Sequence, residues 1–527
     1  MTHYGKNTHL IDSDINVLFE ELLEMNPDQF EQWVVNLRKS VVDIWDNENV
    51  PPRRGKEDRE IIDQWNKMCS YPIHKFTFTD SLGTEVEDDV IVNTSKLGVE
   101  ADQWFPNMYK VRINYTEKDT GYSIYDLFAD DRFKERMIKG CNRHFKRDSM
   151  YLHAPSCIKN NKKTTIIESN DAAEYIRTVR SNREIFGEHD FMLEQVKIKE
   201  GMNSGYNQVD HSNILQLTKE QVVSLKHDGV LEYRHHSTFD ISDMPDDRVY
   251  SVRLYKKGNR IFPKGFAAFR IGYIQPAVNF PPMTAKYIWD RYTEEFKDDE
   301  VIKIYDPSAG WGGRILGAMS ANDNRKIHYI GTDPNPDNFY DGRSKYADIA
   351  DFYNTKTYRG CGLFPETNTY EIHQLGSEVI QHDPEFQKHK GEISVAFTSP
   401  PYFNREAYSE DENQSYKKHG SSYESWRDGF LQPTIETIAE WLRPNGYMIW
   451  NIADILNRGN YLPLEQDSIN IAEQNGLKYL YTLKMRMEGM PGQNRVGEDG
   501  KPLCKNYCQV NGEYQKYEPI FVFKKVR

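Results

Sequence analysis

The segment Thr398–Tyr402, Thr-Ser-Pro-Pro-Tyr, contains residue types that could hold a planar ring bearing an amine. It follows a short apolar run at residues 392–397, which predicts a buried strand ending at this segment. Pro400 and Pro401 fix φ and lack a backbone N–H, so the carbonyls before them are free to accept hydrogen bonds. Such acceptors beside the ring of Tyr402 suit a nucleobase that has left its stack. For the motif alone, a structural turn at the end of a strand is the alternative.

A glycine-rich turn lies upstream of this segment. An apolar strand at residues 302–305 runs into a turn containing Gly310 and Gly312, and a helix then begins. Glycine permits positive φ and close approach of the backbone to a ligand. A second apolar strand, at residues 327–331, ends near Asp333, where an acid would hold ribose hydroxyls in a nucleoside-binding α/β sheet. No Gly-Lys-Ser/Thr follows the glycines, which disfavours a phosphate-binding loop.

Together these segments resemble the S-adenosylmethionine-dependent amino-methyltransferases of DNA, which methylate adenine N6 or cytosine N4. The resemblance covers residues 275–527. It implies that the catalytic residues are Ser399, Pro400, Pro401 and Tyr402. It also implies that S-adenosyl-L-methionine is the cofactor and that its contacts come from Pro281, Thr284, Asp306, Ser308, Gly310, Gly312, Asp333, Ser377 and Glu378.

The chain departs from the family pattern at two places. The family often has Phe at the position of Ser308, and it commonly has Gly-Asp where this chain has Ser377 and Glu378. The residue that contacts the adenine of the cofactor is therefore open, with Asp383 as an alternative to Glu378.

The chemistry that the resemblance implies is direct methyl transfer to an amine. Hydrogen bonds from the amine to Ser399 Oγ and the Pro400 carbonyl would favour a tetrahedral nitrogen whose lone pair points at the sulfonium methyl. Positioning would then be the main catalytic contribution. Methylation at cytosine C5 instead needs a nucleophilic cysteine, typically in a Pro-Cys pair, and the chain contains no such dipeptide.

The target base and the recognition site stay open. Serine at position 399 favours cytosine N4, whereas Asp-Pro-Pro-Tyr is the commoner motif for adenine N6. The alternatives are an RNA methyltransferase, an enzyme that transfers a group other than methyl, and a catalytically idle DNA-binding module. Double-stranded DNA is the expected partner, recognised by the N-terminal half, by residues 404–420 or by the loop Gly489–Arg495. The sequence leaves open a restriction endonuclease partner and the oligomeric state.

Three regions are expected along the chain: a mostly helical region at residues 1–125, a mixed α+β region at 126–265 and a methyltransferase domain at 266–527. Apolar residues recur at helical spacing between Val17 and Trp45. The C-terminal strands are expected at residues 301–305, 327–332, 370–375, 393–399 and 446–452, alternating with helices. This pattern predicts an α/β fold with a doubly wound, Rossmann-like sheet whose sites lie at the C-terminal ends of the strands.

The charge distribution gives a candidate DNA contact. The net charge of −13 argues mildly against a nucleic-acid binder, because phosphate neutralisation needs Lys and Arg. From Arg132 to Lys163, however, there are ten Lys or Arg residues against two acids, with aromatic residues between them. The segment is either a DNA-contacting region or a solvated helix face.

Neither a membrane segment nor a metal site is expected. No apolar stretch approaches the roughly 20 residues that a membrane-spanning helix needs. The first residues lack the apolar segment of a signal peptide, so a cytoplasmic location is expected. Cys504 and Cys508 have no second Cys or His pair nearby at the spacing of a zinc site.

Overall fold

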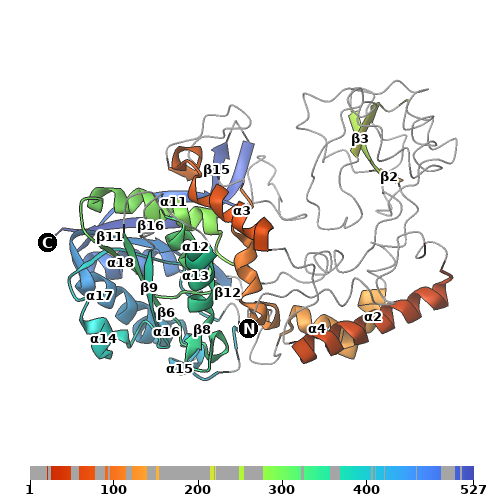
Figure 1. Ribbon diagram of the computed structural model, residues 1–527, viewed down its shortest axis with the longest axis horizontal. Helices are drawn as coiled ribbons and strands as arrows, with labels where there is room; N and C mark the ends of the chain where they lie inside the picture. Colours follow the sequence, from red (N-terminus) through yellow and green to blue (C-terminus); the bar gives the residue numbers. More distant parts are fainter. Residues whose placement is uncertain are drawn as a thin grey trace. The chain divides into compact units, whose positions relative to one another are not determined.

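The computed structural model (Figure 1) describes residues 21, 25–48, 58–76, 89–92, 95–113, 121–138, 150–152, 214–218, 220, 249–254, 277–321, 326–356, 368–404, 407–409, 411–420, 422–457, 460–487, 505–510 and 513–526. The chain divides into two units. One consists of residues 1–4, 56–123 and 277–527, and the other of residues 5–55 and 124–276.

The first unit contains a nine-stranded sheet. Its strand order is β1-β14-β16-β11-β10-β5-β6-β9, with β15 paired to β16. The bounds are β1 Val90–Ile91, β5 Ile302–Asp306, β6 Ile327–Thr332, β9 Thr369–His373, β10 Ile393–Thr398, β11 Leu442–Asn451, β14 Leu477–Arg486, β15 Tyr507–Val510 and β16 Glu513–Lys525. The five strands from β9 to β11 are mutually parallel, whereas β16 runs antiparallel between β11 and β14. The expected α/β fold with a Rossmann-like C-terminal sheet is therefore confirmed.

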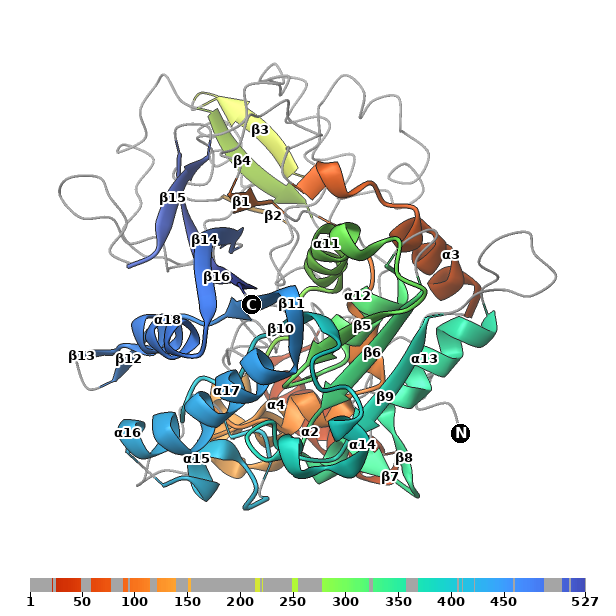
Figure 2. The same cartoon turned by 90° about the vertical axis from the view of Figure 1, so that its left-hand side faces the viewer.

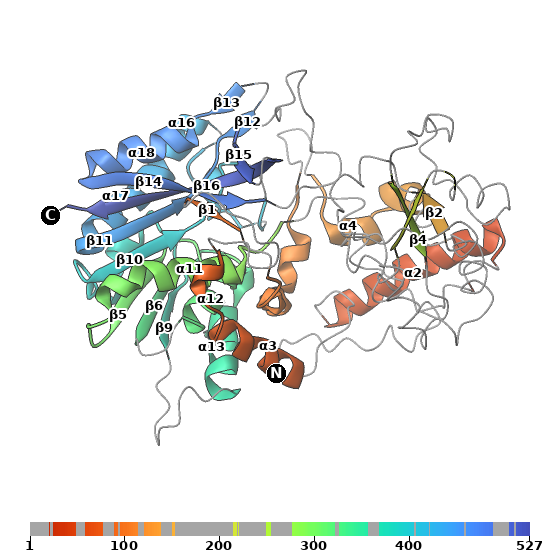
Figure 3. The ribbon, with the colours of Figure 1, turned by 90° about the horizontal axis from the view of Figure 1, so that it is seen from above.

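Helices cover both faces of this sheet (Figures 2 and 3). One face carries α11 (Pro282–Thr293), α12 (Gly313–Met319) and α13 (Lys345–Lys356), and the other carries α14 (Pro384–Gln387), α17 (Gln432–Trp441) and α18 (Leu464–Gln474). All six residues of β10 are buried as a result. A strand covered on both faces reads as a continuous apolar run, which is why its position could be predicted.

The described parts of residues 56–123 pack against the helices of the same sheet. Trp65, in α3 (Asp58–Cys69), stacks on Tyr353 with ring centroids 4.2 Å apart, and Trp104 meets Phe352 edge-on at 5.4 Å. β1 extends the sheet by pairing parallel with β14. Contacts thus group this N-terminal segment with the C-terminal sheet, an association that the sequence did not indicate. The region boundaries expected at residues 125 and 265 stay predictions.

The second unit contains α2 (Pro27–Glu48), α4 (Ile124–Ala129) and a small antiparallel sheet of β2 (Met150–Leu152), β4 (Val249–Leu254) and β3 (Ile214–Thr218). Most apolar residues at helical spacing in α2 are buried, which confirms their interpretation as core positions: Phe30, Trp33, Val34, Leu37, Val41 and Trp45. The apolar residues in the first part of the expected pattern, from Val17 to Leu23, lie outside the described residues. The Arg38 guanidinium donates to Asp131 Oδ1 at 3.2 Å and to the Asp130 carbonyl at 2.6 Å. No helix among the described residues is long and apolar enough to cross a membrane.

Most of the basic segment lies outside the described residues. Of the run from Arg132 to Lys163, the structure describes only residues 132–138 and 150–152. Its role in DNA contact stays a prediction.

We expect Trp104→Ala to destabilise the unit that contains the large sheet by about 3–5 kcal/mol, because a buried indole is removed from between two aromatic rings. Denaturant unfolding followed by circular dichroism measures the change. Val99→Ala is the control, since Val99 is 46% exposed. Equal stability of the two variants would mean that residues 56–123 do not support the sheet.

Candidate active site

The two sequence motifs meet where the strand order reverses. From β5 the chain proceeds to β6 and β9 on one side, and it then returns to β10 and β11 on the other. The glycine-rich turn follows β5, and Ser399–Tyr402 follows the neighbouring β10 (Figure 2). Ligands of open α/β sheets bind outside the C-terminal strand ends at such a reversal. The topology therefore places both motifs where a ligand is expected.

The glycine-rich turn requires glycine for two different reasons. Gly310 and Gly312 have φ of 63° and 77°, in the left-handed region. A Cβ on Gly312 would also lie 2.4 Å from Cε2 of Phe105. Asn279 holds the turn from the other side, because its Oδ1 accepts from Gly313 N at 3.1 Å and its Nδ2 donates to the Trp311 carbonyl at 2.7 Å.

The carboxylate of Asp306 joins the two motifs. It is fully buried, and Oδ2 accepts hydrogen bonds from Arg314 Nε at 2.9 Å and from the Tyr329 hydroxyl at 2.7 Å. Oδ1 accepts from Thr398 Oγ1 at 2.9 Å. Because Thr398 directly precedes Ser399, this carboxylate sets the position of one motif relative to the other. Asp306 is thus engaged within the protein, and a direct contact with the cofactor stays a prediction.

Asp333 lies beside the glycine-rich turn at the end of β6. Its Oδ2 accepts from the Tyr346 hydroxyl at 2.8 Å, and the same hydroxyl lies 2.6 Å from the Gly310 carbonyl oxygen. Burial raises the pKa of the Asp333 carboxyl to about 6, although hydrogen bonds from Asn335, Tyr346 and Gly310 oppose this rise. A carboxylate next to Gly310 is suited to accept ribose hydroxyls, which replace the water that burial removes.

Ser377, Glu378 and Asp383 make contacts within the protein. Ser377 Oγ lies 2.9 Å from the Thr434 hydroxyl, and Glu378 Oε1 forms an ion pair with Lys418 Nζ at 2.7 Å. Asp383 caps α14 by accepting from the backbone N–H of residue 385 at 2.8 Å. None of these contacts identifies the residue that receives the adenine, so that assignment stays a prediction.

The remaining expected cofactor residues surround the turn. Pro281 is the N-cap of α11, and Thr284 is fully buried in the first turn of that helix. Ser308 is half-buried, its carbonyl accepts from the Arg314 guanidinium, and its N–H lies 3.3 Å from Asp306 Oδ1. Helix α11 and the contacts with Asp306 and Arg314 therefore hold these residues in place, and their contacts with a cofactor stay predictions.

The ring of Tyr402 is anchored through its hydroxyl. The hydroxyl donates to Glu518 Oε1 and lies 3.4 Å from the Asn451 carbonyl oxygen. Burial, followed by the charge and the hydrogen bond of Glu518, raises the pKa of the Tyr402 phenol well above its ordinary value. Phe403, the next residue, has φ of 50°, an uncommon conformation for a residue with a bulky side chain. The motif thus leads directly into a turn whose backbone is constrained at Phe403.

Two polar residues at this edge, Glu518 and Asn451, were not predicted from the sequence. Burial raises the pKa of the Glu518 carboxyl, and the hydrogen bond from Tyr402 lowers it in part. Asn451 is buried at the end of β11, where its Nδ2 donates to the Pro519 carbonyl at 3.0 Å and its Oδ1 has no hydrogen-bond partner. The position of Asn451 at the C-terminal end of a parallel strand is the signal that could have identified it.

The segment after Tyr402 is held against the protein. The backbone of Ala407 exchanges two hydrogen bonds with Arg112, at 3.0 and 3.1 Å. A short helix, α15 (Ser415–Lys418), follows, and Tyr416 in it is buried. The described part of residues 404–420 is thus anchored at Ala407 and Tyr416, and its role in recognition stays a prediction. The other candidate, Gly489–Arg495, lies outside the described residues.

Comparisons with known proteins give no family assignment. No protein-family model matches the chain. No curated protein matches it either.

Solved structures of several methyltransferases are similar to this chain at low identity. The CurJ carbon methyltransferase is 13% identical with a TM-score of 0.28, over 47% of this chain and 54% of that one. A SAM-dependent methyltransferase from Methanosarcina mazei is 11% identical with a TM-score of 0.24, over 44% of this chain and 96% of that one. A candidate DNA modification methylase from Thermus thermophilus, complexed with S-adenosyl-L-methionine, is 20% identical with a TM-score of 0.18, over 28% of this chain and 52% of that one. This chain thus spans about half the length of the first and third proteins.

The raised pKa of Asp333 generates a pH prediction. If Asp333 accepts the two ribose hydroxyls as predicted, its protonated form would accept them less well, so the affinity for S-adenosylhomocysteine should fall as the pH drops below about 6. The loss should approach tenfold per pH unit, which corresponds to about 1.4 kcal/mol. Asp333→Asn should bind more weakly by about 1.5–3 kcal/mol at pH 7.5 and lose this pH dependence.

Calorimetric titrations between pH 5 and pH 7.5 test both expectations. His382→Ala serves as the control variant, since the exposed His382 lies outside the site. If the pH dependence persisted unchanged in Asp333→Asn, the titrating group would be another residue.

Proposed function

We propose that this protein transfers the methyl group of S-adenosyl-L-methionine to an exocyclic amino group of a nucleobase in DNA. The observation that carries the proposal is the hydrogen bond from Thr398 to Asp306, which joins the turn beside Asp333 to the turn that contains Ser399–Tyr402. A transferase must hold its donor and acceptor in one geometry, and a rigid link between the two binding segments provides this.

The cofactor side of the proposal rests on Gly310 and Asp333. The Gly310 backbone and the Asp333 carboxylate are held together by the Tyr346 hydroxyl, which lies within hydrogen-bond distance of both. In the proposal, Asp333 accepts the ribose hydroxyls while the glycine backbone allows the adenosine to approach closely. The cofactor, when bound, supplies the electrophilic sulfonium methyl.

The acceptor side rests on Ser399, Pro400 and Tyr402. The amine of the base donates to Ser399 Oγ and the Pro400 carbonyl, while the Tyr402 ring stacks on the base. A phenol already keeps its proton at neutral pH and the raised pKa of Tyr402 strengthens this, so the role of the hydroxyl in the proposal is to orient the ring and not to remove a proton. The hydrogen bond to Glu518 fixes that ring before the base arrives. These residues would hold the amine nitrogen in line with the sulfonium methyl, and the transfer would leave S-adenosylhomocysteine and release one amine proton to solvent.

Cytosine N4 is the favoured target because position 399 is serine. Adenine N6 is the second candidate, and RNA is a third substrate class. Incubation with methyl-labelled S-adenosylmethionine and either DNA or RNA, followed by digestion to nucleosides and mass spectrometry, identifies the product. Label in N4-methylcytidine or N6-methyladenosine from RNA alone would replace DNA by RNA as the substrate. Absence of label in both nucleic acids, with binding of the cofactor retained, would overturn the proposed acceptor.

Tyr402→Ala should lower the single-turnover rate of methyl transfer with little change in cofactor affinity. Stacking on an aromatic ring contributes about 1–3 kcal/mol per base. Tyr402→Phe keeps the ring face but loses the bond to Glu518, so it should retain most of the activity. Tyr514→Ala, at a 37% exposed tyrosine, is the matched control. A rate near wild type for Tyr402→Ala would remove this ring from the substrate site.

Glu518→Gln tests the anchoring of the ring separately. Glutamine can still accept from the Tyr402 hydroxyl, so we expect a small decrease in rate, whereas Glu518→Ala should resemble Tyr402→Phe. In the double variant Tyr402→Phe/Glu518→Ala the two effects should be less than additive, because the side chains act through one hydrogen bond. Full additivity of the two rate effects would indicate that Glu518 acts independently of Tyr402.

A further inference from the structure

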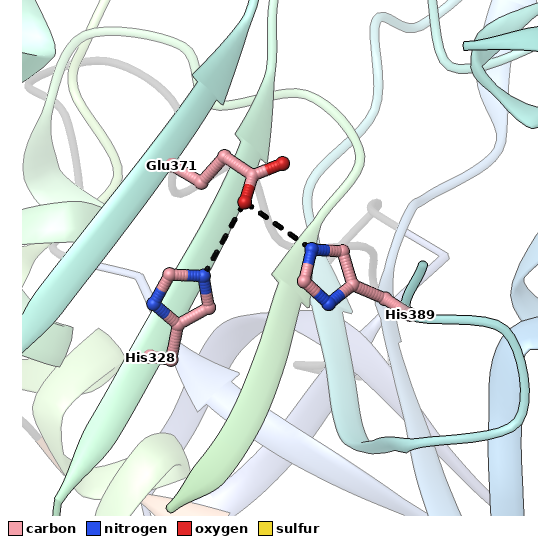
Figure 4. A group of neighbouring side chains, drawn as sticks. All are labelled: His328, Glu371 and His389. Atoms are coloured by element: carbon pink, nitrogen blue, oxygen red, sulfur yellow. Dashed lines mark hydrogen bonds and ion pairs between the residues drawn. The ribbon is translucent and has the colours of Figure 1, made fainter. Parts of the chain in front are cut away.

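A second cluster of chemically active side chains lies on the sheet away from the motif residues. Its members are His328 in β6, Glu371 in β9 and His389 after α14 (Figure 4). Glu371 Oε2 lies 3.2 Å from His389 Nε2 and 3.6 Å from His328 Nε2. The three atoms all lie within 4.8 Å of one another. Two imidazole nitrogens thus converge on a single carboxylate oxygen.

These separations fit a shared metal ion. Nitrogen and oxygen ligands bind zinc at about 2.0–2.2 Å, so two ligands of a tetrahedral ion lie about 3.3 Å apart. The two measured separations lie on either side of this value. Two histidines and one carboxylate are a ligand set for zinc and related divalent ions, which leaves coordination positions for water or another ligand.

The backbone brings the three donors together. In the parallel pairing of β6 with β9, His328 is opposite Thr369 and Ile330 is opposite Glu371, so His328 and Glu371 project from the same face. On that face, Phe386 is buried and its carbonyl accepts from Trp441 Nε1 at 3.2 Å, which holds the turn before His389. The cluster is therefore built on two paired strands and a packed turn.

Outer partners orient two of the ligands. The other carboxylate oxygen of Glu371, Oε1, lies 2.6 Å from His373 Nε2, and His373 Nδ1 lies 3.3 Å from Asp383 Oδ2. His328 Nδ1 lies 2.8 Å from the Thr369 hydroxyl, which leaves Nε2 directed at Glu371. Outer partners of this kind orient the ligands of metal sites. His389 Nδ1 is buried and has no hydrogen-bond partner.

We propose that His328, Glu371 and His389 bind a divalent transition-metal ion of the zinc type. The ion connects the edge strand β9 to β6 and to the turn after α14. The last residue of β9, His373, accepts from Asp333 N through its carbonyl at 3.1 Å, so the ion would also stabilise the strand that supports Asp333. Binding of the ion does not depend on the proposed methyl transfer.

Without a metal ion, protons on the histidine nitrogens would lie between those nitrogens and the Glu371 carboxylate. His328 and His389 could each direct Nε2–H at Glu371, and these contacts, with the close approach of His373, hold the pKa of the Glu371 carboxyl well below its ordinary value. Such a network would need no ion. The experiment must therefore distinguish a metal site from a histidine–carboxylate network.

The test uses the full chain after treatment with a chelator. Zinc is titrated in competition with a chromophoric chelator, and cobalt is titrated while its visible absorption is recorded. His328→Gln and His389→Ala are compared with wild type and with His382→Ala, whose exposed histidine in η9 (Ile380–His382) lies outside the cluster. We expect wild type and the His382 variant to bind one more equivalent than the two cluster variants. His373→Ala should weaken binding about 10–100-fold, as loss of an outer partner does.

The melting temperature gives a second readout. Zinc should raise it in wild type and in His382→Ala, and should raise it less in His328→Gln and His389→Ala. Far-UV circular dichroism establishes that the metal-free variants are folded, and His328→Gln is the milder change because His328 is partly exposed. Equal stoichiometry and affinity in all folded variants would overturn the proposal and leave the proton-linked network. Failure of this test would not affect the methyl-transfer assay, which has a separate readout.

Discussion

The arrangement of the candidate active site depends on one buried carboxylate, that of Asp306. It accepts from Arg314 at the start of α12, from Tyr329 in β6 and from Thr398 at the end of β10. Removing one partner of a buried ion pair typically costs about 3–5 kcal/mol, because the other charge is left unpaired. Replacement of Asp306 would therefore leave the Arg314 guanidinium buried without its carboxylate and would release two strand ends at once. The ion pair of Asp306 with Arg314 is thus as necessary to the site as the residues that are expected to contact ligands.

The sheet was predictable because its central strands are covered on both faces. β10 reads as a largely apolar run bounded by turn residues, and β5 does so apart from Lys303 and the terminal Asp306. The chain between two parallel strands must also contain a crossover. The packing of residues 56–123 could not be predicted in the same way. β1 has two residues, and η2 (Val99–Gln103) and η3 (Pro106–Lys110) are too short to show periodicity. What attaches this segment is aromatic packing, with Phe105 against the glycine-rich turn, and only the tertiary structure shows such a contact.

Within the site, the residues that could be predicted from the sequence are those whose positions are set by the order of the strands. Gly310, Gly312 and Asp333 are near one another because adjacent parallel strands end at one edge of a sheet, and strand order alone implies this. Side-chain partners follow no such rule. Glu378 could be named from its place after β9, but its ion pair with Lys418 joins two segments whose spacing gives no signal. Glu518 belongs to the antiparallel strand β16. The rule that site residues follow the C-terminal ends of parallel strands therefore does not predict it.

The edge strand β9 connects the two clusters of polar residues in the sheet. An exposed strand edge invites pairing with other chains, and charged side chains directed inward are one way to oppose it. β9 has little apolar burial, and its contacts are polar: Glu371 lies between His328, His373 and His389, and the His373 carbonyl holds the backbone of Asp333. The strand that holds the backbone of Asp333 is thus stabilised by a carboxylate and its histidines. A change in what lies between those side chains, whether protons or a metal ion, would therefore act on β9 and, through the hydrogen bond of the His373 carbonyl, on the position of Asp333.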